Sequence, residues 1–191
     1  MLEDLSHVSC CAACGASRAI NLVSAPAGLL SITYFDTPGV NQAISTVGQT
    51  FTTGEECVIL SSFTVGLSPG PRSNQVLIRA LLHTFDLSNN RVTGSPLASQ
   101  STSATQSQGS LTVTFPQPVQ LSPADSYAII LTTAGLGQAA AAFTINVLQT
   151  SIGTPIPGGR VIYLSNGNNV AAIETTPFNS RSGFNYVITI S

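Results

Sequence analysis

The stretch Gln75-Val76-Leu77-Ile78-Arg79-Ala80-Leu81-Leu82-His83-Thr84-Phe85 decides the fold class of this 191-residue chain. Successive side chains of a β-strand point to opposite faces of a sheet, so every second residue shares a face. One face of this stretch carries only apolar side chains, namely Val76, Ile78, Ala80 and Leu82. The other face carries Leu77, Arg79, Leu81, His83 and Phe85. This alternation predicts a long β-strand at residues 75–85.

Short runs of the same kind recur from about residue 27 to the end, with Gly, Pro, Asn and Ser between them. They are Leu29–Tyr34, Gln49–Thr53, Val58–Leu67, Leu111–Phe115, Tyr127–Thr133, Phe143–Val147, Val161–Ser165 and Phe184–Ile190. The polar, Ser-rich stretch Pro96–Thr105 is a further strand or a loop. The Ala-rich stretch Gln138–Phe143 is the one helix candidate, and Gly135 and Gly137 before it favour the entry to a strand. About ten strands at hairpin-like spacing predict an all-β fold, a jelly-roll-like β-sandwich.

The composition points to a protein that packs against copies of itself. Charged residues make up only 7% of the chain, and all six basic residues are Arg. Ordinary soluble domains have roughly 25% charged residues. Ser, Thr, Asn and Gln supply the polarity instead, so little charge repulsion keeps copies apart.

Charge and hydropathy also exclude classes of partner. The net charge of −2 and the scattered arginines argue against nucleic acid, because binding phosphates requires a basic stripe. No run of 18 apolar residues is present, so we expect no membrane span. The first seven residues are acidic and lack the basic-then-apolar order of a signal peptide. Either a leader is removed, or the protein leaves the cell by another route.

Residue patterns of known catalytic sites are absent from the sequence. His7 and His83 have no metal-ligand spacing, and the Gly-rich stretch 155–159 lacks the Lys and following helix of a phosphate site. Asp36, Asp86 and Asp125 each lie beside a predicted turn, where Asp is favoured for its bonds to the backbone. We therefore predict no enzymatic activity, no catalytic residues, no cofactor and no metal.

Carbohydrate binding is the alternative function, because β-sandwiches often carry it on exposed aromatic rings. The chain has no Trp, and most of its Phe and Tyr residues fall on core-facing strand positions. Tyr34, Tyr163 and Phe178 are the aromatic residues expected at the surface. A secreted or surface-anchored adhesive domain that binds a glycan therefore stays open.

The first 26 residues differ from the rest and are read as an N-terminal arm, with the β-sandwich domain at residues 27–191. The arm holds Cys10, Cys11 and Cys14, and the fourth cysteine is Cys57. Three interpretations are open: unpaired thiols, part of a zinc site, and disulfide cross-links. An extended arm of ten or more residues reaches on the order of 30 Å or more, far enough to deliver thiols to neighbouring subunits as well as to its own body.

The body resembles secreted bacterial β-sandwich domains of the choice-of-anchor type. The motifs that carry the resemblance are Gly48–Thr52, Leu60–Val65, Leu121–Tyr127 and Gly158–Gly167. The resemblance implies a secreted β-sandwich domain, and we expect this sequence to depart from that family in having no C-terminal anchor and no signal peptide.

The arm is similar to the N-terminal connector of endospore appendage (Ena-type) fibre subunits, which carry a Cys-Cys pair and a further Cys ahead of a jelly roll. Cys10 and Cys11 match the pair, and Cys14 matches the following cysteine. The resemblance implies that this connector bonds covalently to other subunits of the fibre, with Cys57 as a further acceptor. The gap between Cys11 and Cys14 is shorter than in that family. Appendages assembled inside a sporulating cell need no signal peptide.

Composition and resemblances together predict a self-assembling structural subunit of an extracellular or spore-surface fibre. Subunits are expected to stack through β-sheet contacts and to be cross-linked by disulfides from the arm. The partner is then the protein itself, with a surface anchor or glycan as a further partner.

Overall fold

The computed structural model of the chain describes residues 20–21, 30–36, 44–55, 57–67, 75–105, 109–137, 144–150, 157–181, 185–186 and 188–190. The predicted arm, residues 1–26, lies outside these ranges except for a two-residue strand, and so does the helix candidate at residues 138–143. Burial of side chains is described within these ranges from residue 44 to residue 180, except for residues 144–150.

Strands make up most of the described chain. In chain order the elements are β1 (Ile20–Asn21), β2 (Leu30–Asp36), β3 (Thr46–Thr52), β4 (Val58–Gly66), β5 (Gln75–Asp86), β6 (Arg91–Thr105), β7 (Ser110–Leu121), β8 (Ser126–Thr132), β9 (Thr144–Thr150), β10 (Val161–Leu164), α1 (Ala172–Thr175), β11 (Asn179–Arg181), β12 (Asn185–Tyr186) and β13 (Ile188–Ile190). Each run predicted from the sequence coincides with at least one of these strands, so the all-β expectation is confirmed.

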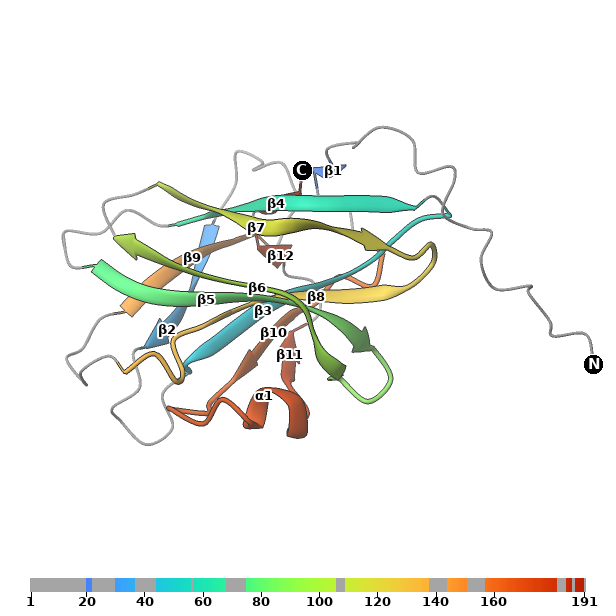
Figure 1. Cartoon of the computed structure of the whole chain (residues 1–191). Coiled ribbons are helices and arrows are strands. Elements are labelled where there is room, and N and C mark those ends of the chain that lie inside the picture. The colour runs from blue at the N-terminus through green and yellow to red at the C-terminus, as the bar shows by residue number, and fades with distance from the viewer. Residues whose placement is uncertain are drawn as a thin grey trace, which may run out of the picture.

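The strands form three antiparallel sheets. The largest has the order β11-β10-β3-β8-β5-β6, the second has β1-β13-β4-β7, and the third has β12-β9-β2. The second sheet lies over the first, with β4 and β7 above β5, β8 and β3 (Figure 1). This arrangement is the predicted jelly-roll-like β-sandwich. Its β1 falls inside the range expected for the arm and pairs with β13.

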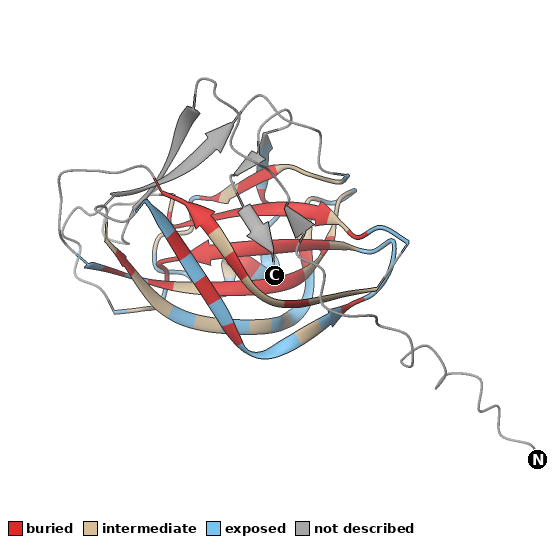
Figure 2. Cartoon of the chain, turned by 90° about the horizontal axis from the view of Figure 1, so that it is seen from above, coloured by how far each residue is buried: buried red, intermediate tan, exposed pale blue. Residues whose placement is uncertain are grey.

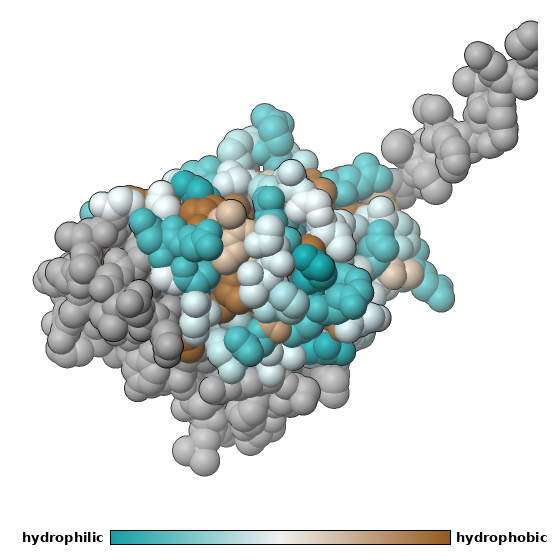
Figure 3. Space-filling view, turned by 90° about the horizontal axis from the view of Figure 1, so that it is seen from below, coloured by the Kyte–Doolittle hydropathy of each residue, from teal (hydrophilic) through white to brown (hydrophobic). Residues whose placement is uncertain are grey.

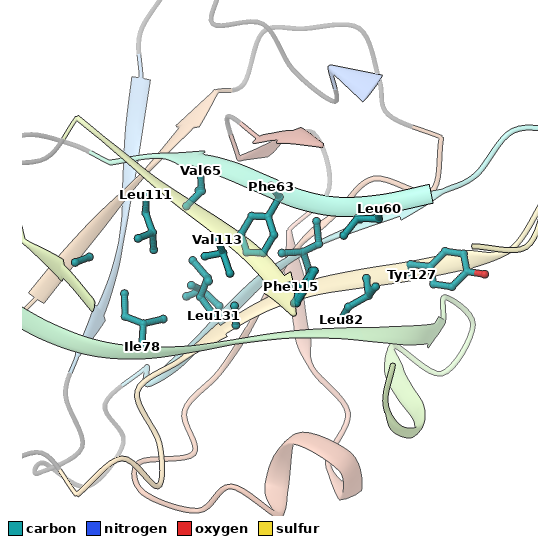
Figure 4. Close-up of a cluster of buried hydrophobic side chains, with 14 of the residues drawn as sticks. Leu60, Phe63, Val65, Ile78, Leu82, Leu111, Val113, Phe115, Tyr127 and Leu131 are labelled. Carbon is teal, nitrogen blue, oxygen red and sulfur yellow. The ribbon is translucent and has the colours of Figure 1, made fainter. Parts of the chain in front are cut away.

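The main core fills the space between these two sheets. Residues of alternating strand positions meet there, as the period of two requires. Phe63 of β4 and Phe115 of β7 have ring centroids 5.9 Å apart, and Phe63 is fully buried. Side chains from β4 and β7 point toward Ile78 and Leu82 of β5 (Figure 4). The apolar face predicted for residues 76–82 is therefore a core face: all four of its side chains belong to this cluster.

A second, smaller core covers the other face of the six-stranded sheet. Leu81 and Phe85 of β5 pack there with Ile130 of β8 and with two residues from the C-terminal part, Ile173 and Phe178. We call residues 165–178, which contain α1, the α1 cover. Because both faces of the sheet are packed, its central strands are buried along nearly their whole length (Figure 2).

The α1 cover was not expected from the sequence. Its helix has only four residues, too short to show a helical period. Phe178, expected at the surface, is instead 3% exposed and packs edge-on against Phe85 at a centroid distance of 6.2 Å. The expectation for Phe178 is wrong because this ring belongs to the cover and packs against the six-stranded sheet.

Candidate assembly surfaces

Strand β6 ends the six-stranded sheet, and its backbone is the first candidate surface. Among the described strands it pairs with β5 alone, from Gln75 opposite Thr105 to Asp86 opposite Arg91. A terminal strand presents every second pair of N–H and C=O groups away from the sheet. We call residues 98–104 the β6 edge; they pair with residues 76–82 of β5 without interruption.

The β6 edge lacks the devices that usually keep edge strands from pairing. Natural edges are protected by charged side chains, Pro or bulges. The β6 edge reads Ala-Ser-Gln-Ser-Thr-Ser-Ala, with no charge and no Pro. Pro96 and a break in the register opposite His83 lie just before it and end the regular segment there. Ser99 and Ser101 are exposed on its outer face.

Strand β7 ends the second sheet and is a poorer template. It pairs with β4 only, among the strands described, and contains Pro116 and Pro118, which have no N–H to donate. Its outward side chains include Thr112, whose hydroxyl lies 2.8 Å from the hydroxyl of Thr64 across the strand pair. Compared with β7, the β6 edge is therefore not interrupted by proline, and it pairs with no described strand other than β5.

Cys57 is the one predicted site residue that lies within the described ranges. It immediately precedes β4, is half-buried, and accepts a hydrogen bond from the Gln120 side chain, with 3.8 Å between Nε2 and Sγ. Cys57 is disulfide-bonded, and the other half of that disulfide lies outside the described residues. Cys10, Cys11 and Cys14 also lie outside them, so their predicted roles stay predictions.

Asp86, one of the acidic residues beside a predicted turn, stabilises that turn through its carboxylate. The Asp86 carboxylate accepts hydrogen bonds from the backbone N–H of Ser88 and Asn89, at 2.8 and 3.0 Å, and from the Asn89 side chain. The bond from the Asn89 side chain lowers the pKa of Asp86 most, and the bonds from the backbone lower it further. The turn role expected for Asp86 is confirmed. Across the ranges that the structure describes, no three His, Cys, Asp or Glu residues gather into a possible metal site.

The aromatic residues suggested for sugar binding do not form a platform in the described part of the chain. Tyr163 is half-buried and packs against the main core, while Phe178 is enclosed by the second core. Tyr34 lies in β2, where side chains are not described.

Comparisons with known proteins leave the chain without an assigned family. No protein-family model matches it, and no curated protein matches it. Within the described residues, none of the helical structure has the length and apolar character needed to cross a membrane.

Proposed function

We propose that this protein is the self-assembling subunit of an extracellular or spore-surface fibre. Copies would associate through β-sheet edges and be locked together by disulfides that involve Cys57 and the N-terminal cysteines. The observation that carries the proposal is the β6 edge: seven consecutive uncharged residues on a terminal strand that pairs with β5 alone among the described strands.

Edge pairing supports the proposal through backbone chemistry. A neighbour that adds a strand to β6 satisfies its outward N–H and C=O groups, and this mode needs no particular side-chain pocket. With 7% charged residues in the chain, little electrostatic repulsion opposes the approach of a second copy.

The cysteines support the covalent step. Cys57 takes part in a disulfide, and the other three cysteines of the chain stand at positions 10, 11 and 14. An N-terminal cysteine can bond to Cys57 of its own chain or to Cys57 of a neighbouring subunit. The two disulfides are chemically identical, so one can replace the other. Such an exchange between copies costs little free energy, as in domain swapping.

A charged edge should prevent assembly while leaving the fold intact. We expect the double substitution Ser99→Glu and Ser101→Glu to lower the fraction of protein in high-mass assemblies at least about tenfold, because like charges would face each other across paired edges. Arg79 lies opposite Ser101 on β5, so the new carboxylate at 101 gains a favourable cross-strand partner. The measurement is sedimentation velocity of the reduced and the oxidised protein, with electron microscopy of the sedimented material.

The matched control places the same two charges away from sheet edges. Ser122→Glu with Thr176→Glu changes two exposed residues, one in the turn before β8 and one directly after α1. This control should assemble like the parent. If the edge variant and the control assemble equally, the β6 edge is not the assembly surface. If the parent stays monomeric, the fibre proposal is wrong.

A further inference from the structure

His83 is a fully buried histidine in strand β5. Its exposed fraction is 0%, and neither Nδ1 nor Nε2 meets a partner among the described residues. Buried polar groups in proteins are nearly always paired, so an imidazole left in this state is unusual. It lies on the face of β5 that carries Leu81 and Phe85, between these two residues of the second core.

The backbone around His83 is irregular on one side. Leu82 pairs with Ala98 and Thr84 with Thr93, so residues 94–97 of β6 have only His83 opposite them. Gly94 adopts a φ of 69°, a left-handed conformation that glycine accepts without strain. On the other side, in β8, His83 pairs regularly with Ala128.

Hydrogen bonds attach both ends of the α1 cover to the sandwich. At its start, the Asn166 side chain accepts bonds from the hydroxyls of Ser45 and Thr46, at 2.7 and 2.8 Å, and the Asn168 side chain accepts one from the Gly135 N–H at 2.7 Å.

The end of the α1 cover is attached to the β5–β6 hairpin. Phe178 donates its backbone N–H to Asn90 at 2.7 Å, and the Asn90 side chain donates to the Phe178 carbonyl. Arg91 donates to the Thr175 carbonyl at 3.3 Å. The cover's buried side chains in the second core are Ile173 and Phe178, each at most 3% exposed, and Val170 and Ala172 pack beside them. Seen from the side of α1, the described surface is mostly polar or neutral, with smaller apolar areas (Figure 3).

The charged groups around the ring are few. Desolvation by burial lowers the pKa of His83, while the Glu174 carboxylate of α1 and the Gly94 backbone act more weakly in the opposite direction. The Gly94 group faces the ring without the geometry of a hydrogen bond. The β8 residues on this face, Ala128 and Ile130, carry no charge. Asp86 and Arg91 lie at the end of the β5–β6 hairpin, next in sequence to Phe85 and Val92 of the second core. Because successive strand side chains point to opposite faces, these two charges face away from that core.

We propose that His83 and the α1 cover form a proton-operated latch: the cover is closed while the imidazole is neutral, and protonation of the imidazole opens it. Among the described residues, no group accepts a hydrogen bond from the buried ring in good geometry, whereas water solvates the cation once the cover lifts. Opening exposes the outer face of the six-stranded sheet, including Leu81 and Phe85. The latch is independent of the proposed fibre function, since it lies within a single chain.

The direction of the pH effect follows from the two protonation states. With the cover open, His83 titrates near its ordinary pKa of about 6.5; with the cover closed its pKa is lower. The closed form is therefore fully stable above about pH 6.5 and loses stability as the pH falls toward the closed-form pKa. Within that window the equilibrium constant for opening rises about tenfold for each pH unit.

Hydrogen exchange of single amides tests the latch. The Phe178 amide, bonded to Asn90 at 2.7 Å, reports on the cover, and the Leu67 amide, bonded to Gly109 at 3.0 Å, reports on the opposite sheet. After correction for the intrinsic exchange rate, opening at Phe178 should rise at least tenfold between pH 7.5 and pH 5, and opening at Leu67 should stay constant. Equal behaviour of the two amides would overturn the proposal.

Two variants separate His83 from other acid effects. His83→Leu removes the titrating ring, so exchange at Phe178 should lose its pH dependence. His7→Gln, which replaces the only other histidine, should keep it. An unchanged pH response in His83→Leu would contradict the latch.

A titration of the unmodified protein supplies a test that does not depend on the folding of His83→Leu. Its two histidines give two imidazole Cε1–H signals in NMR spectra, and His7→Gln assigns them. A His83 signal that titrates near 6.5 while the Phe178 amide stays protected would rule the latch out.

Discussion

Gly48→Ala is expected to lower the free energy of unfolding by about 3 kcal/mol, the upper part of the usual range for an overpacked core. Gly48 lies in β3 at the centre of the six-stranded sheet, between Ile130 of β8 and Ile162 of β10. A methyl group on its Cα would stand 2.6 Å from the Ile129 carbonyl oxygen and 3.2 Å from both isoleucine side chains. The oxygen belongs to a paired backbone, so relief requires a shift of β8 itself.

Chemical denaturation of the reduced monomer measures this cost, and Gly54→Ala is the matched control. Gly54 is exposed in the turn after β3, and a methyl group there meets no atom within 4 Å. We expect the control to change the unfolding free energy by no more than about 0.5 kcal/mol. Similar midpoints for the two variants would mean that β3 and β8 are not packed as tightly as the structure has them.

The strands could be predicted because the period of two is a local property of the sequence. Leu111, Val113 and Phe115 alternate with threonines, and all three are buried in the main core. The pattern also gave the two faces of β5 correctly. Its outer face was harder to interpret: Leu77 is 46% exposed, whereas His83 is fully buried. Burial on that face depends on the α1 cover, which contacts only one end of the strand.

The boundaries missed from the sequence are places where tertiary pairing overrides local signals. Strand β6 begins at Arg91 rather than at Pro96, and continues through Gly94 because β5 pairs with both parts of it. Strand β7 runs on to Leu121 through Pro116 and Pro118, since a terminal strand tolerates residues without an N–H.

Of the candidate assembly surfaces, the cysteines could be predicted from the sequence and the β6 edge could not. The cysteines are visible as residue types, so Cys57 could be singled out at once, and it lies at the entry to β4 as expected. The β6 edge could not be located, because strand order is a non-local property. The hydroxyl-rich sequence of β6 would look the same in the middle of a sheet, where its backbone would be fully paired.

Removing the Cys-Cys pair is expected to abolish covalent assembly. In the proposed fibre, the never-reduced protein runs on a denaturing gel as a ladder or as material too large to enter. Cys10→Ser with Cys11→Ser should convert at least about nine-tenths of it to a band near the chain mass of 19.7 kDa. Reductant should do the same to the parent, because a thiolate exchanges readily with accessible disulfides. The fold should persist, since the described residues of the main core all lie at position 44 or beyond, far along the chain from the two substitutions.

The control for this experiment changes the same segment without removing a thiol. Ala12→Ser with Ala13→Ser introduces two hydroxyls beside the cysteines and should leave the ladder unchanged. Cys57→Ser should shorten the ladder too, because it removes the acceptor that is disulfide-bonded in the structure. The opposite result is equally informative: if the never-reduced parent gives one band near 19.7 kDa that only shifts in mobility on reduction, the Cys57 disulfide closes within each chain. Its role would then be to stabilise the single subunit, by roughly 2–4 kcal/mol, and any fibre would have to assemble through the β6 edge without covalent bonds.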